Sequence, residues 1–332
     1  MLKKIIVKVV KFSLFLSIGI ILFWWAYRDQ NIDEIVNALK NANFFWIGAS
    51  LVFGFLSHLS RAMRWNLMLQ PLGYNPRISN TLFAVFVMYL ANIAFPRLGE
   101  VSRCGIMKRY EKVQLSQALG TVFIERIVDF ILLVLLLAVV LIAQFQQIFA
   151  FLRDNVSHKF ANIIVSSQSF IAVSIFGIVA VFLFIIFRKK LQATSLYRKI
   201  EDIFLDFIEG IKTIKTLENR TAFIAHSLFI YLMYFLMIYV CFFAFDFTSH
   251  LSAMVGLTVF VLASFGMVAP SPGGIGTWHI MAIGTLLIYQ ISESHAKAFA
   301  FAAHGSMTLF LIVAGFVSLI LLPVTNKNTQ KS

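Results

Sequence analysis

Long apolar windows recur along the whole chain, and they constrain its fold more than any other feature. A bilayer core of about 30 Å is crossed by roughly 20 apolar residues of α-helix. Such windows lie at 9–27, 44–60, 78–95, 122–146, 163–187, 221–245, 251–269, 276–291 and 298–322. With 60% apolar and 13% charged residues, the composition excludes a water-soluble fold. The chain is therefore predicted to be an all-α, polytopic membrane protein.

Two further segments are amphipathic. Residues 30–42 place apolar side chains on one helix face and acids on the other, and residues 192–217 repeat apolar side chains at helical spacing within a basic stretch. Both are predicted to lie as helices in the headgroup region. The whole chain, residues 1–332, is expected to form a single integral membrane domain that ends in a short cytoplasmic tail at 323–332.

Clusters of Lys and Arg predict the orientation, because such loops favour the cytoplasmic side. They lie at 3–11, 61–77, 97–112 and 188–220. Both termini are therefore placed in the cytoplasm, with the chain in the cell (inner, or cytoplasmic) membrane. All these loops can share one side only if the apolar segments 78–95 and 251–291 are interrupted or re-entrant hairpins. About six full spans and the two hairpins would give eight or more membrane segments.

The two predicted hairpins are interrupted in a similar way. One contains Pro96 followed by Gly99, and the other contains Pro270 followed by Gly273. Two interrupted segments that enter from opposite faces are typical of an inverted repeat, and in transporters such breaks mark the substrate site. The alternative is two unrelated loop breaks.

Ionisable residues in or beside the apolar windows are functional candidates, because a charge at the bilayer centre costs about 3 kcal/mol. Three groups occur: His58, Arg61 and Arg64; Arg97, Glu100 and Arg103; Glu125, Arg126 and Asp129. Guanidinium groups near a helix N-terminus suit a lipid phosphate. We expect the arginines and carboxylates to gather in a hydrated pocket within the bilayer. The alternative is a purely structural set of ion pairs.

The glycine-rich segment that follows Pro272 contains Gly273, Gly274 and Gly276, with His279 just beyond it. It is predicted to be a tight break between half-helices, where glycine allows close backbone approach. No nucleotide-binding motif is present, and the two cysteines form no metal-ligand spacing. The sequence therefore predicts no metal, no cofactor, no catalytic residue and no nucleic-acid partner. The predicted substrate-binding residues are Arg61, Arg64, Arg97, Glu100, Arg103, Glu125, Arg126, Asp129, Gly273, Gly274, Gly276 and His279.

Four motifs in this order resemble those of a known family. They are RAMRW at 61–65, NIAFPRLGEVSR at 92–103, ERIVD at 125–129 and PGGIG at 272–276. The resemblance is to the membrane domain of lysylphosphatidylglycerol synthases and to the stand-alone flippase-like proteins related to it, and it covers about 40–322. It implies a polytopic protein that moves a lipid between leaflets. The best-understood members flip lysyl-phosphatidylglycerol made by a fused cytoplasmic aminoacyltransferase domain.

The chain departs from the family pattern in two ways. Only ten residues follow Leu322, so synthesis of an aminoacylated lipid is not expected from it. Many relatives carry an acid, which could face a cationic headgroup, where this chain has His279. The resemblance therefore leaves a different phospholipid, an isoprenoid phosphate or a glycolipid open as the substrate.

The sequence as a whole predicts a lipid transporter for a phosphate-bearing or zwitterionic headgroup. The arginines would hold the phosphate, and the carboxylates would balance these charges or bind a headgroup amine. No ATP-binding motif is present, which predicts downhill or ion-coupled movement. Two alternatives stay open: an intramembrane enzyme that acts on a lipid-linked substrate, and a non-catalytic partner of a separate lipid-modifying synthase.

Overall fold

The computed structural model describes residues 32–95, 98–155, 217–268 and 271–327, and every regular element in these ranges is helical. The predicted spans at 9–27 and 163–187, and residues 192–216 of the predicted second amphipathic helix, lie outside the described residues. Contacts divide the chain into two compact units, Met1–Val140 with Thr216–Ser332, and Leu141–Lys215. The larger unit holds all the predicted site residues.

In the smaller unit the described residues are the end of α6 (Leu115–Ala143), Gln144 and helix α7 (Phe145–Asn155).

The described part of the larger unit begins with two helices joined at an angle of 82°, α2 (Ile32–Lys40) and α3 (Phe44–Leu69). Acidic residues occupy the first turn of α2 and a lysine its last turn, which suits the helix dipole. The segment predicted to be amphipathic at 30–42 therefore contains a helix, and its place in the headgroup region stays a prediction.

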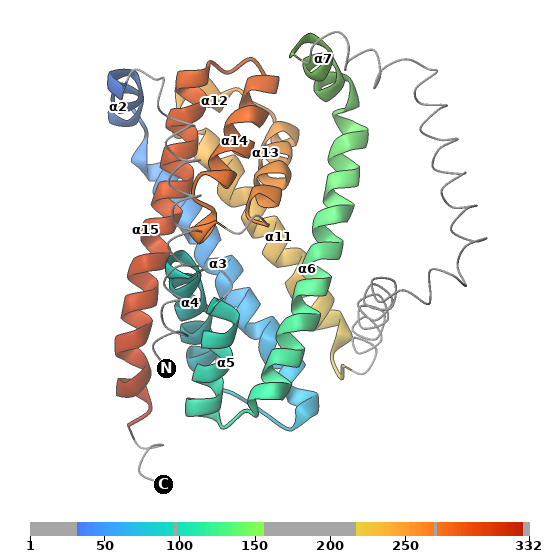
Figure 1. Cartoon of the computed structure of the whole chain (residues 1–332), viewed down its shortest axis with the longest axis vertical. Helices are drawn as coiled ribbons and strands as arrows, with labels where there is room; N and C mark the ends of the chain where they lie inside the picture. The colour runs from blue at the N-terminus through green and yellow to red at the C-terminus, as the bar shows by residue number, and fades with distance from the viewer. Residues whose placement is uncertain (1–31, 96–97, 156–216, 269–270, 328–332) are drawn as a thin grey trace, which may run out of the picture. The chain divides into compact units, whose positions relative to one another are not determined.

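Two helical hairpins approach each other from opposite ends of the larger unit (Figure 1). The first pairs α4 (Ile78–Ala94) with α5 (Leu98–Glu111), and the second pairs α13 (Ala253–Gly266) with α14 (Thr277–Ile288). Both hairpins pack against α15 (Glu293–Thr325), the first through α4 and the second through α14. Helix α11 (Arg220–Phe242) contacts the second hairpin through α13, and α3 contacts the first through α4. The remaining helices of this unit are α6 (Leu115–Ala143), α11 (Arg220–Phe242), α12 (Asp246–Ser249) and α15 (Glu293–Thr325).

The tips of the two hairpins meet. The 3₁₀ turn η2 (Pro272–Gly274), which connects α13 to α14, contacts α4, and a Cβ atom on Gly273 would lie 3.1 Å from Cγ1 of Ile93. Gly273, Gly274 and Gly276 have φ values of 58°, 78° and 84°, which strain any other residue. The predicted tight break is therefore confirmed, and it lies against the end of the first hairpin.

The non-helical backbone at the tip of the second hairpin has hydrogen-bond partners. The hydroxyl of Thr277 donates to the carbonyl of Gly274 at 3.2 Å, and Nε2 of His304 lies 3.0 Å from the carbonyl oxygen of Gly273. Irregular backbone at membrane depth requires such partners, because hydrocarbon offers none. The same need explains why a polar side chain, that of His304, lies at this break.

Three described helices are long and apolar enough to cross a membrane, namely α6, α11 and α15, and the bent α2–α3 pair would add a fourth. Helices α4, α13 and α14 are shorter. The helical membrane class is confirmed, whereas eight or more membrane segments are not. The predicted boundaries also need correction, because α15 continues through Pro323 to Thr325 and α6 starts at Leu115. Hydropathy locates the apolar centre of a helix and misses its polar ends.

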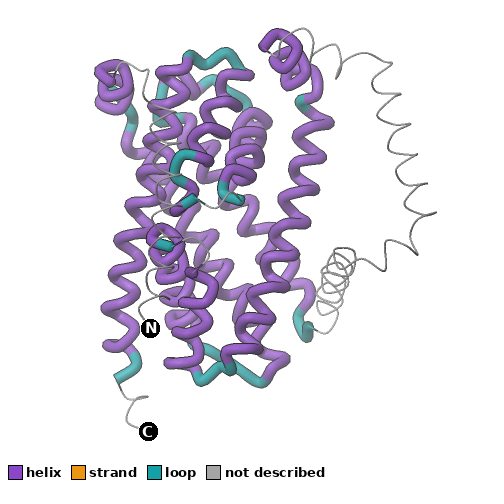
Figure 2. The backbone as a smooth tube through the Cα atoms, in the orientation of Figure 1, coloured by secondary structure: helices purple, strands orange, loops and turns teal. Residues whose placement is uncertain are grey.

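Polar contacts join several helix ends on one side of the larger unit. The amides of Asn80 and Asn326 exchange hydrogen bonds of 2.9 and 2.8 Å, and Asn80 also donates to Glu111 at 2.6 Å. The hydroxyl of Tyr74 donates to Gln117 at 2.9 Å. Figure 2 shows the loops between α3 and α4 and between α5 and α6 on this side. The basic loops near 61–77 and 97–112 are predicted to share one side, and these two loops do. That this side is cytoplasmic stays a prediction.

Gly99 provides a test of the first hairpin. A Cβ atom there would lie 2.1 Å from the carbonyl oxygen of Met88 and 2.7 Å from the side chain of Asn92, which accepts a hydrogen bond from the Gly99 amide. We expect Gly99→Ala to lower the free energy of unfolding by about 1–3 kcal/mol through overpacking, measured by thermal unfolding in detergent. Gly105→Ala, in the same helix with nothing within 4 Å, is the control. Equal melting temperatures would contradict this packing.

Candidate functional site

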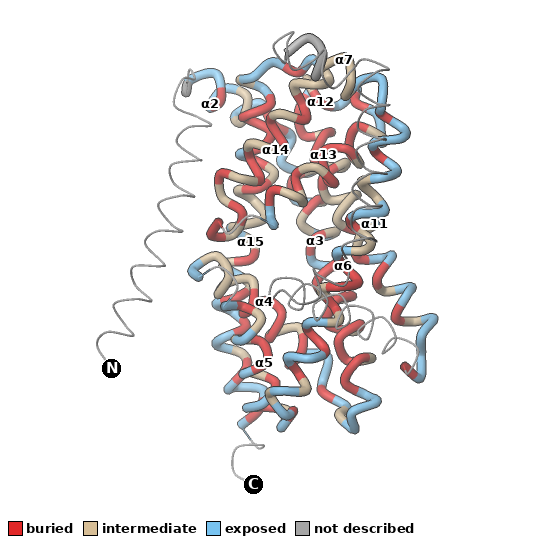
Figure 3. The backbone as a smooth tube through the Cα atoms, turned by 45° about the vertical axis from the view of Figure 1, so that its right-hand side comes forward, coloured by how far each residue is buried: buried red, intermediate tan, exposed pale blue. Residues whose placement is uncertain are grey.

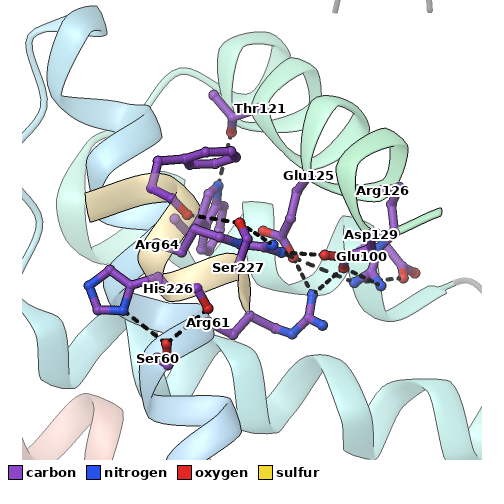
Figure 4. Close-up of polar contacts among 12 residues, drawn as sticks. Ser60, Arg61, Arg64, Glu100, Thr121, Glu125, Arg126, Asp129, His226 and Ser227 are labelled. Atoms are coloured by element: carbon purple, nitrogen blue, oxygen red, sulfur yellow. Dashed lines mark hydrogen bonds and ion pairs between the residues drawn. The ribbon is translucent and has the colours of Figure 1, made fainter. Parts of the chain in front are cut away.

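Two arginines of α3 meet two carboxylates of α6 inside the larger unit (Figure 4). Nη1 of Arg61 lies 2.5 Å from Oε1 of Glu125 and 2.8 Å from Oδ2 of Asp129. Nη2 of Arg64 lies 2.7 Å from Oδ1 of Asp129 and 3.5 Å from Oε1 of Glu125. The predicted helical spacing places each pair on one face, and the two faces point toward each other.

Helix α5 supplies the third arginine. Nη2 of Arg103 lies 3.0 Å from Oε2 of Glu125, and its guanidinium carbon lies 4.3 Å from the ring centroid of Trp65. The indole N–H of Trp65 in turn donates to Thr121 at 2.9 Å. We call Arg61, Arg64, Arg103, Glu125 and Asp129 the ion cluster. It links α3, α5 and α6, with three positive charges against two negative ones.

The ion cluster is buried. The side chains of Arg64, Arg103 and Glu125 are 0% exposed, that of Arg61 is 4% exposed and that of Asp129 is 12% exposed. Figure 3 shows the buried residues of α6 alternating with exposed ones along the helix. Charges so placed need close opposite partners, since the interior solvates them poorly. The five side chains therefore gather as expected, but they pack against one another and do not line the pocket expected around them.

Two predicted residues lie at the more exposed edge of the cluster. The side chains of Arg126 and Glu100 are 40% and 25% exposed, and Nη2 of Arg126 lies 3.6 Å from Oε1 of Glu100. Arg126 also lies 3.9 Å from Glu125 and 3.8 Å from Asp129. These distances are longer than those of a good charged hydrogen bond. Arg126 is thus held electrostatically by three carboxylates while 40% of its side-chain surface stays exposed.

Sequence reasoning missed three tyrosines beside the ion cluster. The hydroxyl of Tyr231 donates to the backbone carbonyl of Asp129, and Nη2 of Arg61 donates to the hydroxyl of Tyr234 at 3.4 Å. The hydroxyl of Tyr89 lies 3.1 Å from that of Tyr234. Tyr231 and Tyr234 occur three residues apart on an apolar helix, a polar stripe that the sequence does display.

The remaining predicted residues lie outside the ion cluster. Arg97 is outside the described residues. The glycines form the hairpin tip described above, and the amide of Gly276 donates to Nδ1 of His279 at 3.3 Å. The ring of His279 lies 4.7 Å from that of His304 and packs on Trp278. The contacts seen for His279 thus stabilise the start of α14, and a binding role for these residues stays a prediction.

A pocket of about 320 Å³ lies at the end of α3, and no member of the ion cluster lines it. Its lining consists of Met63, Asn66, Leu67, Gln70, Asn75, Pro76, Ile78 and His226. Nδ1 of His226 lies 2.9 Å from the hydroxyl of Ser60. Within the described ranges no group of three His, Cys, Asp or Glu residues is arranged to hold a metal ion.

Apolar helices that bury paired charges between them define a multi-pass membrane protein of the polytopic helical class. The chain belongs to the family described as the lysylphosphatidylglycerol synthase TM region, which matches residues 9–315. The family resemblance drawn from the four sequence motifs is therefore confirmed.

Curated relatives are distant. The glycosyltransferase AglD of Haloferax volcanii is 22% identical over 88% of this chain and 51% of its own length. Two proteins of Methanocaldococcus jannaschii, the UPF0104 membrane proteins MJ1078 and MJ1595, are 26% and 23% identical over 39% and 37% of this chain, or 50% and 38% of their own lengths. The chain thus spans about half the length of these relatives or less. No solved structure matches the chain significantly.

Glu125 is the residue on which the ion cluster should depend most, because all three of the cluster's arginines lie within 3.5 Å of it. We expect Glu125→Gln to lower the free energy of unfolding by about 3–5 kcal/mol, the usual cost of breaking a buried pair. Thermal unfolding in detergent measures this. Glu100→Gln makes the same change at a 25% exposed side chain and should cost about 0–1 kcal/mol. Similar losses in both variants would contradict the assignment.

Proposed function

We propose that this protein is a lipid transporter of the flippase type, which moves a phosphate-bearing or zwitterionic lipid between the leaflets of the cell membrane. The observation that carries the proposal is the ion cluster, which carries one more positive than negative charge in the interior of a helical membrane protein. An unbalanced positive charge favours an anionic ligand, and guanidinium groups match phosphate.

The edge of the ion cluster would receive the headgroup. Arg126 is the most exposed arginine beside the cluster, and Glu100 lies 3.6 Å from it. Oε2 of Glu100 has no hydrogen-bond partner among the described residues. The phosphate would bind to Arg126 and an amine or hydroxyl of the headgroup to Glu100, while the acyl tails stay in the surrounding hydrocarbon. Arg97 directly precedes α5 in the sequence and would add a second guanidinium.

The two hairpins would supply the route through the membrane. Interrupted helices that meet at mid-membrane mark substrate sites in transporters built from inverted repeats. Here the tip at Gly273 approaches Ile93, next to the break between α4 and α5. We infer that both hairpins are re-entrant and form an inverted repeat, with the ends of α3 and α15 near Leu69 and Thr325 in the cytoplasm.

Transport can be tested with the purified chain in vesicles. We expect Arg126→Gln and Glu100→Gln to reduce leaflet transfer of a fluorescent phosphatidylglycerol at least tenfold, with little change in melting temperature, because both side chains are partly exposed. Arg109→Gln removes an exposed arginine of the neighbouring helix and should transfer at the wild-type rate. Wild-type rates in both site variants would refute the proposed site.

A second candidate function is a membrane partner for an enzyme that acts on a lipid-linked substrate. The observation that favours it is the match of 88% of this chain to a protein named as a glycosyltransferase. The partner role predicts that the chain alone leaves lipid masses unchanged and transfers no lipid, yet co-purifies with a separate synthase.

Mass spectrometry separates transport from catalysis. After the purified protein is incubated with membrane lipids, we expect every lipid mass to be unchanged, since transport makes and breaks no covalent bond. A new lipid mass that disappears in Glu125→Gln or Asp129→Asn would instead establish an intramembrane enzyme and overturn the transporter assignment. Vesicles without protein provide the blank.

A further inference from the structure

Arg61 uses only one edge of its guanidinium group in the ion cluster. Its Nη1 atom makes both short carboxylate contacts, at 2.5 and 2.8 Å. Its Nη2 atom makes a long hydrogen bond of 3.4 Å to Tyr234, and its Nε atom has no partner among the described residues. The Nε–Nη2 edge is the one that binds two oxygens of a phosphate side by side. That edge is buried and almost uncommitted.

His58 lies one helical turn before Arg61 on the same face of α3. It is 1% exposed, and within the described part of the chain neither ring nitrogen has a hydrogen-bond partner. Buried polar groups are nearly always paired with protein, water or an ion. A buried histidine with two unpaired nitrogens beside a partly unpaired arginine therefore indicates a ligand that belongs between them.

Two hydroxyls face the same place from other helices. The ring of His58 lies 4.5 Å from that of Tyr89 on α4 and 6.2 Å from that of Tyr234 on α11. The hydroxyls of Tyr89 and Tyr234 are 3.1 Å apart. Both tyrosines are half-buried, whereas His58 is 1% exposed. The ring of Phe86 also lies near His58, with the two ring centroids 5.7 Å apart.

The chemistry of these side chains favours an oxyanion as the ligand. Among the described neighbours of His58 are the guanidinium of Arg61, two phenol hydroxyls and the ring of Phe86, and none of these four is a carboxylate. A headgroup amine would be repelled by Arg61, because Glu125 and Asp129 contact the opposite side of this guanidinium, at Nη1. Phosphate oxygens would accept from the arginine, the hydroxyls and one imidazole N–H.

We propose that His58, the Nε–Nη2 edge of Arg61, Tyr89 and Tyr234 form an inner phosphate subsite, deeper than the Arg126–Glu100 edge. Glu125 and Asp129 are then positioning residues, which hold Nη1 of Arg61 so that its opposite edge faces the subsite. The subsite would be the second binding site for the phosphate of the transported lipid, so this proposal rests on the proposed function. A free phosphate ion would satisfy the same groups.

Binding to the full-length chain in a phosphate-free maltoside detergent tests the subsite. The probes are water-soluble dihexanoyl phosphatidylglycerol and inorganic phosphate, each titrated by calorimetry. We expect His58→Phe, which keeps an aromatic ring and loses both nitrogens, to weaken lipid binding roughly tenfold or more. Arg61→Lys, which keeps the charge and loses the fork, should weaken it similarly. His226→Phe changes a histidine outside the subsite and should bind like the wild type.

Tyr89→Phe removes a single hydroxyl, so it keeps the test decisive if His58→Phe does not fold; several-fold weaker binding is expected. Wild-type affinity in His58→Phe, or in Tyr89→Phe if the former is unfolded, would overturn the subsite. If Arg126→Gln still reduced leaflet transfer in that case, the proposed transport would stand without the subsite. If the wild type bound inorganic phosphate but not the lipid, and the subsite variants no longer bound inorganic phosphate, the subsite would be upheld and its assignment to a lipid overturned.

Discussion

Paired burial of charge is the interaction on which this structure depends. Three arginines and two carboxylates come from α3, α5 and α6, and each lies within 3.0 Å of at least one opposite charge, almost wholly removed from solvent. In a poorly solvating interior, each charge is stable only while its partners are in place. The ion cluster therefore ties α6 to the first hairpin and to α3, and it couples any movement of these helices to the state of its charges.

The second constraint is that broken helices in a membrane must pair their free backbone groups internally. At the second hairpin this is achieved by left-handed glycines, by Thr277 and by His304. At the first hairpin, Asn92 accepts from the amide that opens α5. Each hairpin thus has a side chain that stabilises the start of its second helix, and the two tips pack together.

Much of the site could be predicted from sequence, because charges within apolar windows are costly and therefore informative. That reasoning found every member of the ion cluster. It did not find His58's unpaired nitrogens or the hydroxyls of Tyr89 and Tyr234. Tyrosine and histidine are common in membrane helices, and only the residues packed around them show whether they belong to a site. It also expected these residues to line a hydrated pocket, because a sequence shows which charges are present and does not show how closely they pack against one another.

The sequence by itself determined the helical membrane class, the positions of the broken segments and the residues that must be paired, because hydropathy and charge act locally along the chain. Only the tertiary structure decided which arginine meets which carboxylate, that the hairpin tips meet, and that the Nε–Nη2 edge of Arg61 has only one long hydrogen bond among the described residues. Those outcomes depend on side-chain directions of helices far apart in the chain, and packing in three dimensions sets these directions.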